Sequence, residues 1–307
     1  MPLAPIVLFV YKRVDHLRRT LETLHDNVLA EKSELIVFSD GPKNPQNKEE
    51  VEAIENVRKL IKSKNWCGKV ELVAYEKNQG INTNYYLSLA RVFSTHDKAI
   101  VIEDDLLLSP FFLTYMNQSL DIYKNENRVM QISGYWFPVK SDPLPDTFFL
   151  QLSCSWGWAT WKDRWENLIK DPKEVYNKIK AINGFPKFNL DGIYKDFEKQ
   201  LTANAEEKVK DGWDICWYGT LFLSDSLVLF PSQSLVKNIG FDSSGSHYFE
   251  GGINFNVELY ERCIPLEKVE CIESAAARKA LYNYFKKEQF GLRNKIKYKL
   301  KKIFKSA

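Results

Sequence analysis

Residues 98–109 read KAIVIEDDLLLS, an apolar run that leads directly into three consecutive carboxylates, Glu103, Asp104 and Asp105. A short run rich in β-branched residues predicts a strand buried on both faces, as in a parallel sheet. Open α/β sheets bind ligands at the carboxyl ends of such strands. Because adjacent carboxylates repel one another, we expect a positive partner here, with a phosphate-bound divalent metal as the first candidate. A solvated acidic turn is the plainer alternative.

The residues around this stretch alternate between strand and helix patterns. Apolar runs predict strands at 6–10, 35–38, 70–75 and 129–133. Apolar stripes at helical spacing predict helices along Leu17, Leu21, Leu24 and Val28, along Val51, Ile54, Val57 and Ile61, and along Ile81, Tyr85, Leu89 and Val92. Asn47 with Glu50 predicts the start of the second helix, and Ser109-Pro110 the start of another that reaches about Tyr123.

This alternation predicts an α/β fold, a mostly parallel sheet flanked by helices. Polar residues that follow three of the strands, Arg13, Asp40 and Asn78, then share one edge with the acidic cluster. Such an edge suits a nucleotide, although the sequence has neither a G-x-G-x-x-G nor a Walker A motif.

Composition narrows the class of protein. The 307 residues are 44% hydrophobic, and no run approaches the ~20 apolar residues of a membrane span. The N-terminal MPLAPIVLFVYKR has no basic segment before its apolar run, so we expect no signal peptide. The five cysteines are scattered without C-x-x-C spacing, which favours reduced thiols in a cytoplasmic protein over a zinc site or a disulfide framework.

Charge is concentrated at the C-terminal end. Residues 286–307 hold nine Lys or Arg and one acid, a net of +8, so the remaining chain carries 3 − 8 = −5. We expect no nucleic-acid partner. Within this tail, apolar residues at helical spacing predict a basic amphipathic helix that binds an anionic membrane surface, with a solvated end as the alternative; they are Leu292, Ile296, Leu300 and Ile303. The expected division is a catalytic domain, 1–285, with halves 1–135 and 136–285, and a tail, 286–307.

The second half is rich in aromatic residues, with the segment SWGWATW at 155–161. Most of these tryptophans are expected in the core, although a tryptophan face also suits a sugar ring. Residues 238–256 are rich in Gly, Ser and Asn and include His247, which predicts a loop over a ligand or an ordinary surface loop.

Several segments together resemble the N-acetylglucosaminyltransferase I family of GT-A fold enzymes. VIEDDLLLSPFFLTYM (101–116) resembles the family's E-D-D strand end followed by a Pro-Phe-Phe helix start. Weaker matches occur in the family's order over about residues 3 to 250: IVFSDG (36–41), SWGWATW, GWDICW (212–217) and GSHY (245–248). The resemblance implies a Rossmann-type nucleotide-binding half and an irregular, aromatic-rich acceptor half. The family's N-terminal membrane anchor and stem have no counterpart in this sequence, so we do not expect a Golgi enzyme.

The resemblance also implies roles for individual residues. Asp105 would be the sole direct protein ligand of Mn²⁺ or Mg²⁺, and Asp214 the catalytic base. The nucleotide-sugar donor would be bound by Arg13, Asp40 (uracil), Asp104 (ribose), Glu103, Trp156 and Trp213 (sugar) and Ser246 (closing loop). Trp156 and Gly245 replace an aliphatic residue and a valine of the family pattern, so the sugar need not be N-acetylglucosamine.

The implied reaction moves a sugar from a UDP-sugar to a hydroxyl of a glycan or lipid-linked acceptor, with inversion, in the synthesis of cell-surface polysaccharide or glycoconjugate. A hard divalent ion would neutralise the leaving diphosphate, and a carboxylate would take the proton of the attacking hydroxyl. Asp211 is a rival base, and a helix-capping role is the structural alternative for either aspartate. Two other functions stay open: a non-catalytic nucleotide-sugar or glycan-binding module, and a metal-dependent phosphohydrolase or nucleotidyltransferase.

Overall fold

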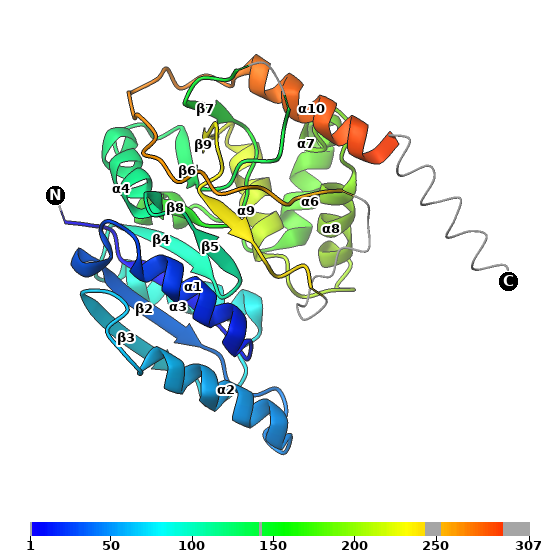
Figure 1. The fold of residues 1–307 in the computed structure, drawn as a ribbon. Helices are drawn as coiled ribbons and strands as arrows, with labels where there is room; N and C mark the ends of the chain where they lie inside the picture. The colour runs from blue at the N-terminus through cyan, green and yellow to red at the C-terminus, as the bar shows by residue number, and fades with distance from the viewer. Residues whose placement is uncertain (1, 141–142, 243–252, 291–307) are drawn as a thin grey trace, which may run out of the picture.

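The fold was analysed in a computed structural model, which describes residues 2–140, 143–242 and 253–290 (Figure 1). The first half alternates strictly between strand and helix, as predicted. Its elements are β1 (Ile6–Val10), α1 (Val14–His25), a 3₁₀ turn (Ala30–Lys32), β2 (Glu34–Ser39), α2 (Lys48–Ile61), β3 (Lys69–Ala74), α3 (Ile81–Phe93) and β4 (Lys98–Glu103). Figure 1 shows this half in blue and cyan, with β1, β2, β3 and β4 side by side.

The predicted helices form for the expected reasons, with one error in extent. The side chain of Asn47 accepts a hydrogen bond from the backbone N–H of Glu50 (3.2 Å), which caps α2. In α1, Leu17, Leu21 and Leu24 are buried, but the helix ends at His25. Val28 therefore lies beyond the helix and is 60% exposed, so its assignment to the apolar stripe was wrong.

The predicted helix start at Ser109-Pro110 was also wrong. Helix α4 (Phe112–Tyr123) begins two residues after Pro110, with Phe111 at its cap position. Oγ of Ser109 does accept the N–H of Phe111 (3.3 Å), but the N–H of Leu113 donates to Oδ1 of Asn27 (3.0 Å) and the Pro110 carbonyl accepts the N–H of Val28 (3.0 Å). Partners distant in the sequence therefore bind backbone groups that a first helical turn starting at Pro110 would use.

Four more strands, one near the end of the first half and three from the second, join the same sheet, so both halves share one sheet and one hydrophobic core. These strands are β6 (Val129–Ser133), β7 (Thr147–Leu150), β8 (Trp158–Trp161) and β9 (Leu227–Pro231). The order of the sheet is β3-β2-β1-β4-β8-β6-β9-β7, in which β8 and β7 run antiparallel to the other six strands. The predicted mostly parallel α/β sheet is confirmed.

The remaining elements surround the carboxyl end of β4 and the β7 edge. A two-stranded sheet of β5 (Leu106–Leu108) and β10 (Val236–Asn238) follows directly after the acidic cluster. The other helices are α5 (Lys162–Trp165), α6 (Pro172–Ala181), α7 (Phe185–Phe188), α8 (Asp196–Ala205), α9 (Trp213–Leu223) and α10 (Ala275–Phe290). α10 crosses the expected boundary at 285, while residues 291–307 of the predicted membrane-binding tail lie outside the described residues. Among the helices described, none has the length and apolar character needed to cross a membrane.

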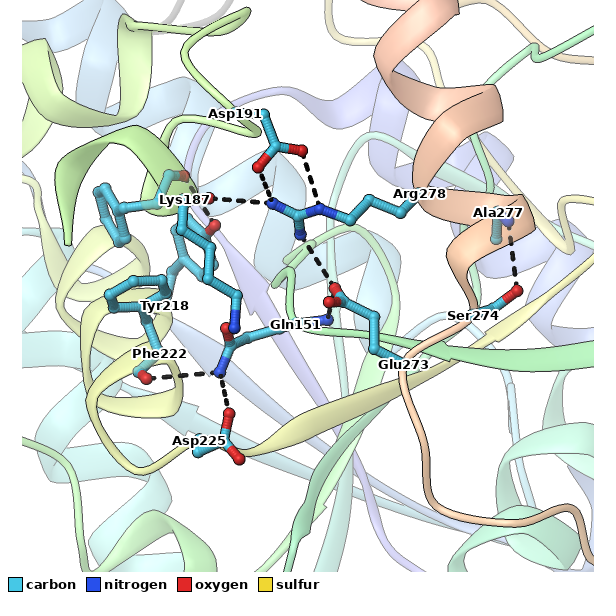
Figure 2. Close-up of polar contacts among 11 residues, drawn as sticks. Gln151, Lys187, Asp191, Tyr218, Phe222, Asp225, Glu273, Ser274, Ala277 and Arg278 are labelled. Carbon is cyan, nitrogen blue, oxygen red and sulfur yellow. Dashed lines mark hydrogen bonds and ion pairs between the residues drawn. The ribbon is translucent and has the colours of Figure 1, made fainter.

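A polar network attaches α10 to the β7 edge (Figure 2). The guanidinium of Arg278 donates two hydrogen bonds to Asp191 (3.0 and 2.9 Å) and one to Glu273 (3.0 Å). Glu273 also accepts the backbone N–H of Gln151 (3.0 Å), and the Gln151 amide reaches Asp225 (3.1 Å). One arginine thereby connects the C-terminal helix to three segments that are distant in the sequence.

We expect Arg278→Met to lower the free energy of unfolding by about 2–3 kcal/mol, because it leaves two carboxylates without their charged donor. The side chain of Arg278 is only 16% exposed. The matched control is Arg91→Met, which breaks an ion pair with Glu71 at a side chain that is 59% exposed and should cost no more than about 1 kcal/mol. Urea denaturation measures both, and equal losses would contradict a stabilising role for the network.

Candidate active site

The carboxyl ends of three parallel strands bring the predicted site residues together. In the sheet register, Phe9 of β1 pairs with Glu103 of β4, and Val10 pairs with Ser39 of β2. The residues that follow these strands therefore start from the same edge of the sheet. Arg13 follows β1, Asp40 follows β2, and the acidic cluster ends β4.

Arg13 supplies the positive charge expected beside the acidic cluster. It occupies the cap position of α1, and its Nη2 contacts Oδ1 of Asp104 and donates to Oδ2 of Asp105 (2.9 Å). Burial opposes the charge of the guanidinium, but the two carboxylates outweigh that effect and raise the pKa of Arg13. The sequence predicted a nucleotide contact for Arg13, whereas here it bridges two carboxylates.

Desolvation raises the pKa of two carboxylates of the cluster, Asp104 and Glu103. Burial raises the pKa of Asp104 to about 6, although the charge of Arg13 acts in the opposite direction. Burial and the neighbouring charge of Asp105 raise the pKa of Glu103 to about 8. The hydroxyl of Tyr85 donates to Glu103 (2.5 Å) and favours its charged form. Because these carboxylates are packed closely together and desolvated, the site favours the binding of cations.

An aromatic stack positions Tyr85 and joins the two halves of the chain. The Tyr85 ring stacks on Phe9 of β1 on one face and on Trp213 of α9 on the other, with centroids 3.9 and 3.8 Å apart. Trp213 is 2% exposed. The predicted sugar-lining residue thus lies directly behind Glu103 and helps to hold the Tyr85 hydroxyl against that carboxylate.

Asp105 combines the features of a metal ligand. Its Oδ1 is buried and has no hydrogen-bond partner among the residues that the structure describes, while Oδ2 is held by Arg13. Within the described part of the chain, no group of three or more His, Cys, Asp or Glu residues could hold a metal ion. A divalent ion therefore fits here only if Asp105 is its protein ligand and other oxygen ligands, such as phosphates, complete the coordination.

Gly240 packs directly against Asp105. A Cβ atom built on this glycine would lie 2.1 Å from Oδ2 of Asp105 and 3.2 Å from Nη1 of Arg13. The backbone carbonyl of Asp105 also accepts the N–H of Ile239 (2.9 Å). The segment after β10 therefore covers the acidic cluster, and only glycine allows its close approach.

Asp40 is buried where β2 and β3 end. Its Oδ1 accepts the backbone N–H groups of Gly41 and Gln79, both at 2.8 Å. Burial raises the pKa of Asp40, and these hydrogen bonds act in the opposite direction. Asn78 donates to the carbonyl of Gly41 (3.0 Å), so the predicted grouping of Asp40 and Asn78 at one edge is confirmed.

Asp214 lies in the first turn of α9, one residue after the stacked Trp213. Its Oδ1 accepts the backbone N–H of Ile215 (2.8 Å) and the amide of Gln200 (3.1 Å). The cap position of α9 is Gly212, so neither Asp214 nor Asp211 occupies the cap position considered above. The charge of Asp214 contributes to the raised pKa of Glu103, which places the two carboxylates in one electrostatic environment.

Trp156 belongs to a second aromatic cluster, which is separate from the Tyr85 stack. It makes edge contacts with Tyr135, Phe241 and Phe255 (centroids 4.7, 5.4 and 5.6 Å), and Phe241 follows Gly240 directly. Ser246 and His247 lie outside the described residues.

Sequence reasoning missed three residues that shape the site. Tyr85 was counted only as part of an apolar stripe, although a tyrosine in such a stripe signals a hydroxyl that needs a partner. Gln200 carried no local signal, because its role depends on its contact with Asp214. Gly240 lies within the predicted loop at 238–256, but its packing on Asp105 was not predicted.

One curated protein is similar to this chain over more than half of its length. The chain is 24% identical over 190 residues to an alpha-1,3-mannosyl-glycoprotein 2-beta-N-acetylglucosaminyltransferase of Arabidopsis thaliana, which covers 58% of this chain and 42% of that protein. The chain thus spans less than half the length of this curated relative.

Two solved structures have a remote likeness to the chain, each with a TM-score of 0.41. One is the mannosyltransferase PcManGT of Pyrobaculum calidifontis in complex with GDP-Man and Mn²⁺ (11% identity, 72% of this chain and 74% of that chain). The other is TarS 1–349 of S. aureus (10% identity, 78% and 61%).

The family assignment rests on the sequence. The model of the GNT-I family matches residues 1–170, which include the strand ends that carry Arg13, Asp40 and the acidic cluster. Because this match extends over more than half of the 307 residues, the chain belongs to the GNT-I family.

Proposed function

We propose that this chain is a glycosyltransferase that moves a sugar from a UDP-sugar to a hydroxyl of a glycan or lipid-linked acceptor. The observation that carries the proposal is the buried acidic cluster at the end of β4, beside Asp40 and Asp214, in a member of the GNT-I family. N-acetylglucosamine is the first candidate for the sugar, because it is named in the description of the Arabidopsis relative.

The donor would lie along the strand ends. Uracil presents an N–H between two carbonyls, and the buried carboxylate of Asp40 suits that donor. Asp104 would accept from the ribose hydroxyls, and Glu103, held by Tyr85, would accept from the sugar. Trp156, Trp213 and Ser246 are proposed to complete the sugar and nucleotide contacts.

Asp105 is the residue that would hold Mn²⁺ or Mg²⁺, because its buried Oδ1 has no partner within the described part of the chain. A divalent ion bound there would neutralise the negative charge that develops on the leaving diphosphate.

Asp214 is the proposed general base. Its carboxylate is oriented by Gln200 and by the N–H of Ile215, which keeps one face of the group fixed. A single displacement with this base would invert the anomeric centre.

The wider setting of the reaction is also proposed. We place the chain in the cytoplasm, in cell-surface polysaccharide or glycoconjugate synthesis, with the basic tail on an anionic membrane surface. The charge of that tail, +8 over residues 286–307, supports the last point.

Asp105→Asn is expected to keep the fold and to lower turnover on the order of 10²-fold, because it removes the ligand of the divalent ion. The assay is hydrolysis of UDP-, GDP- and dTDP-sugars in Mn²⁺, together with calorimetric titration of UDP with and without Mn²⁺. Asp97→Asn, at the opposite end of β4, is the matched control and should behave as the wild type. Undiminished turnover of the wild type in EDTA would contradict the role of the metal.

Asp214→Asn is expected to lower turnover by about 10²–10⁴-fold with little change in UDP affinity, because the base lies outside the nucleotide contacts. Asp211→Asn, three residues upstream, is the matched variant and should retain most of the activity. The opposite order of the two variants would move the base to Asp211. NMR of the sugar released from an α-linked UDP-sugar, recorded before mutarotation, should show the β anomer, and an α product would contradict a single displacement.

Gly240→Ala is expected to weaken Mn²⁺-dependent UDP binding by about 10-fold or more, because its Cβ would displace the Asp105 carboxylate. Lys237→Ala, a partly exposed residue of β10, is the control that should leave binding unchanged. Calorimetry measures both affinities, and wild-type affinity in Gly240→Ala would show that the close packing on Asp105 has no role in binding.

A further inference from the structure

A groove of about 460 Å³ opens beside the start of α3, outside the acidic cluster. This volume lies within the range of small-molecule sites. One wall comes from the nucleotide-binding half and carries amide and hydroxyl side chains, which are Gln79, Asn82 and Thr83. None of the functions assigned above uses this groove.

The opposite wall comes from the second half of the chain. Asn204 of α8 contributes an amide, and Pro172 and Val209 contribute apolar surface. Val209 is 40% exposed, so its side chain is accessible from the groove. Glu207 and Lys210 add opposite charges that balance.

Each asparagine of the groove binds a residue that is next to Asp214, the proposed base, in the sequence or in space. Oδ1 of Asn82 accepts the backbone N–H of Trp213 (3.0 Å), the residue before Asp214. The amide of Asn204 donates to the carbonyl of Gln200 (3.0 Å), whose own side chain holds Asp214.

Gly212, at the start of α9, packs against the wall of the groove. A Cβ atom at Gly212 would lie 2.5 Å from Cγ of Asn204, so the wall of the groove packs directly on the residue before Trp213. The groove therefore lies against the segment that carries the proposed base.

We propose that this groove binds the acceptor, and that it takes a neutral saccharide. Amides and hydroxyls both donate and accept hydrogen bonds, which matches the hydroxyls of a sugar ring. The apolar surface of Val209 and Pro172 suits the C–H face of such a ring, and the balanced charges of Glu207 and Lys210 disfavour a phosphate group. This inference rests on the proposed function, because it assigns the acceptor of the same reaction.

The test uses the full chain and saturation-transfer NMR with the methyl glycosides of mannose, glucose, galactose and N-acetylglucosamine. At least one glycoside should bind the wild type. Val209→Trp and Thr83→Trp each fill the groove from an exposed position and should weaken that binding by about tenfold or more. Val28→Trp places the same ring on a valine that is 60% exposed elsewhere and should bind as the wild type does.

The outcomes separate this inference from the proposed function. Unchanged glycoside binding in both groove variants, or no binding of any of the four glycosides to the wild type, would overturn the inference. Thermal unfolding checks that each variant is folded, and the two variants approach the groove from different walls. UDP titration of the wild type tests the proposed function separately, since failure to bind UDP with Mn²⁺ would contradict the donor site whatever the glycosides do.

Discussion

The close packing of three adjacent carboxylates at the end of β4, with Asp104 and Asp105 buried and Glu103 partly buried, is the constraint on which the rest of the site depends. Such a group is unfavourable in a desolvated place, and Arg13 is the one guanidinium that the structure brings onto Asp104 and Asp105. The raised pKa values of Glu103 and Asp104 show that this compensation is incomplete. A site of this kind favours ligands that bring further positive charge. This is the chemical reason for proposing that a divalent ion binds there together with a diphosphate.

The two halves of the chain pack against each other beside the acidic cluster and share one core. The stack of Phe9, Tyr85 and Trp213 runs from β1 through α3 to α9, and it holds the Tyr85 hydroxyl on Glu103. The same helix α9 presents Asp214 one residue later. Donor contacts and the proposed base are therefore fixed relative to each other by one rigid aromatic packing.

Family membership and local geometry support the same chemistry by independent routes. The family match ends at residue 170, so it includes the acidic cluster but neither Asp214 nor Gly240. The roles proposed for those residues depend on contacts in the structure, through Gln200 for Asp214 and through close packing for Gly240. The two tryptophans also differ in their burial. Trp156 is partly exposed, whereas Trp213 is buried.

The sequence by itself determined the strand–helix alternation of the first half, the buried strand β4 and the grouping of Arg13, Asp40 and the acidic residues at one edge. These features follow from apolar periodicity and from the common direction of parallel strands, which are local properties. Only the tertiary structure decided that Arg13 bridges the carboxylates, that Tyr85 binds Glu103 and that Gly240 covers Asp105. Contacts between residues such as Gly240 and Asp105 depend on how whole elements pack, and no pattern of neighbouring residues encodes that. The misplaced helix start at Ser109 has the same cause, because distant residues bind the Leu113 N–H and the Pro110 carbonyl that the first helical turn would use.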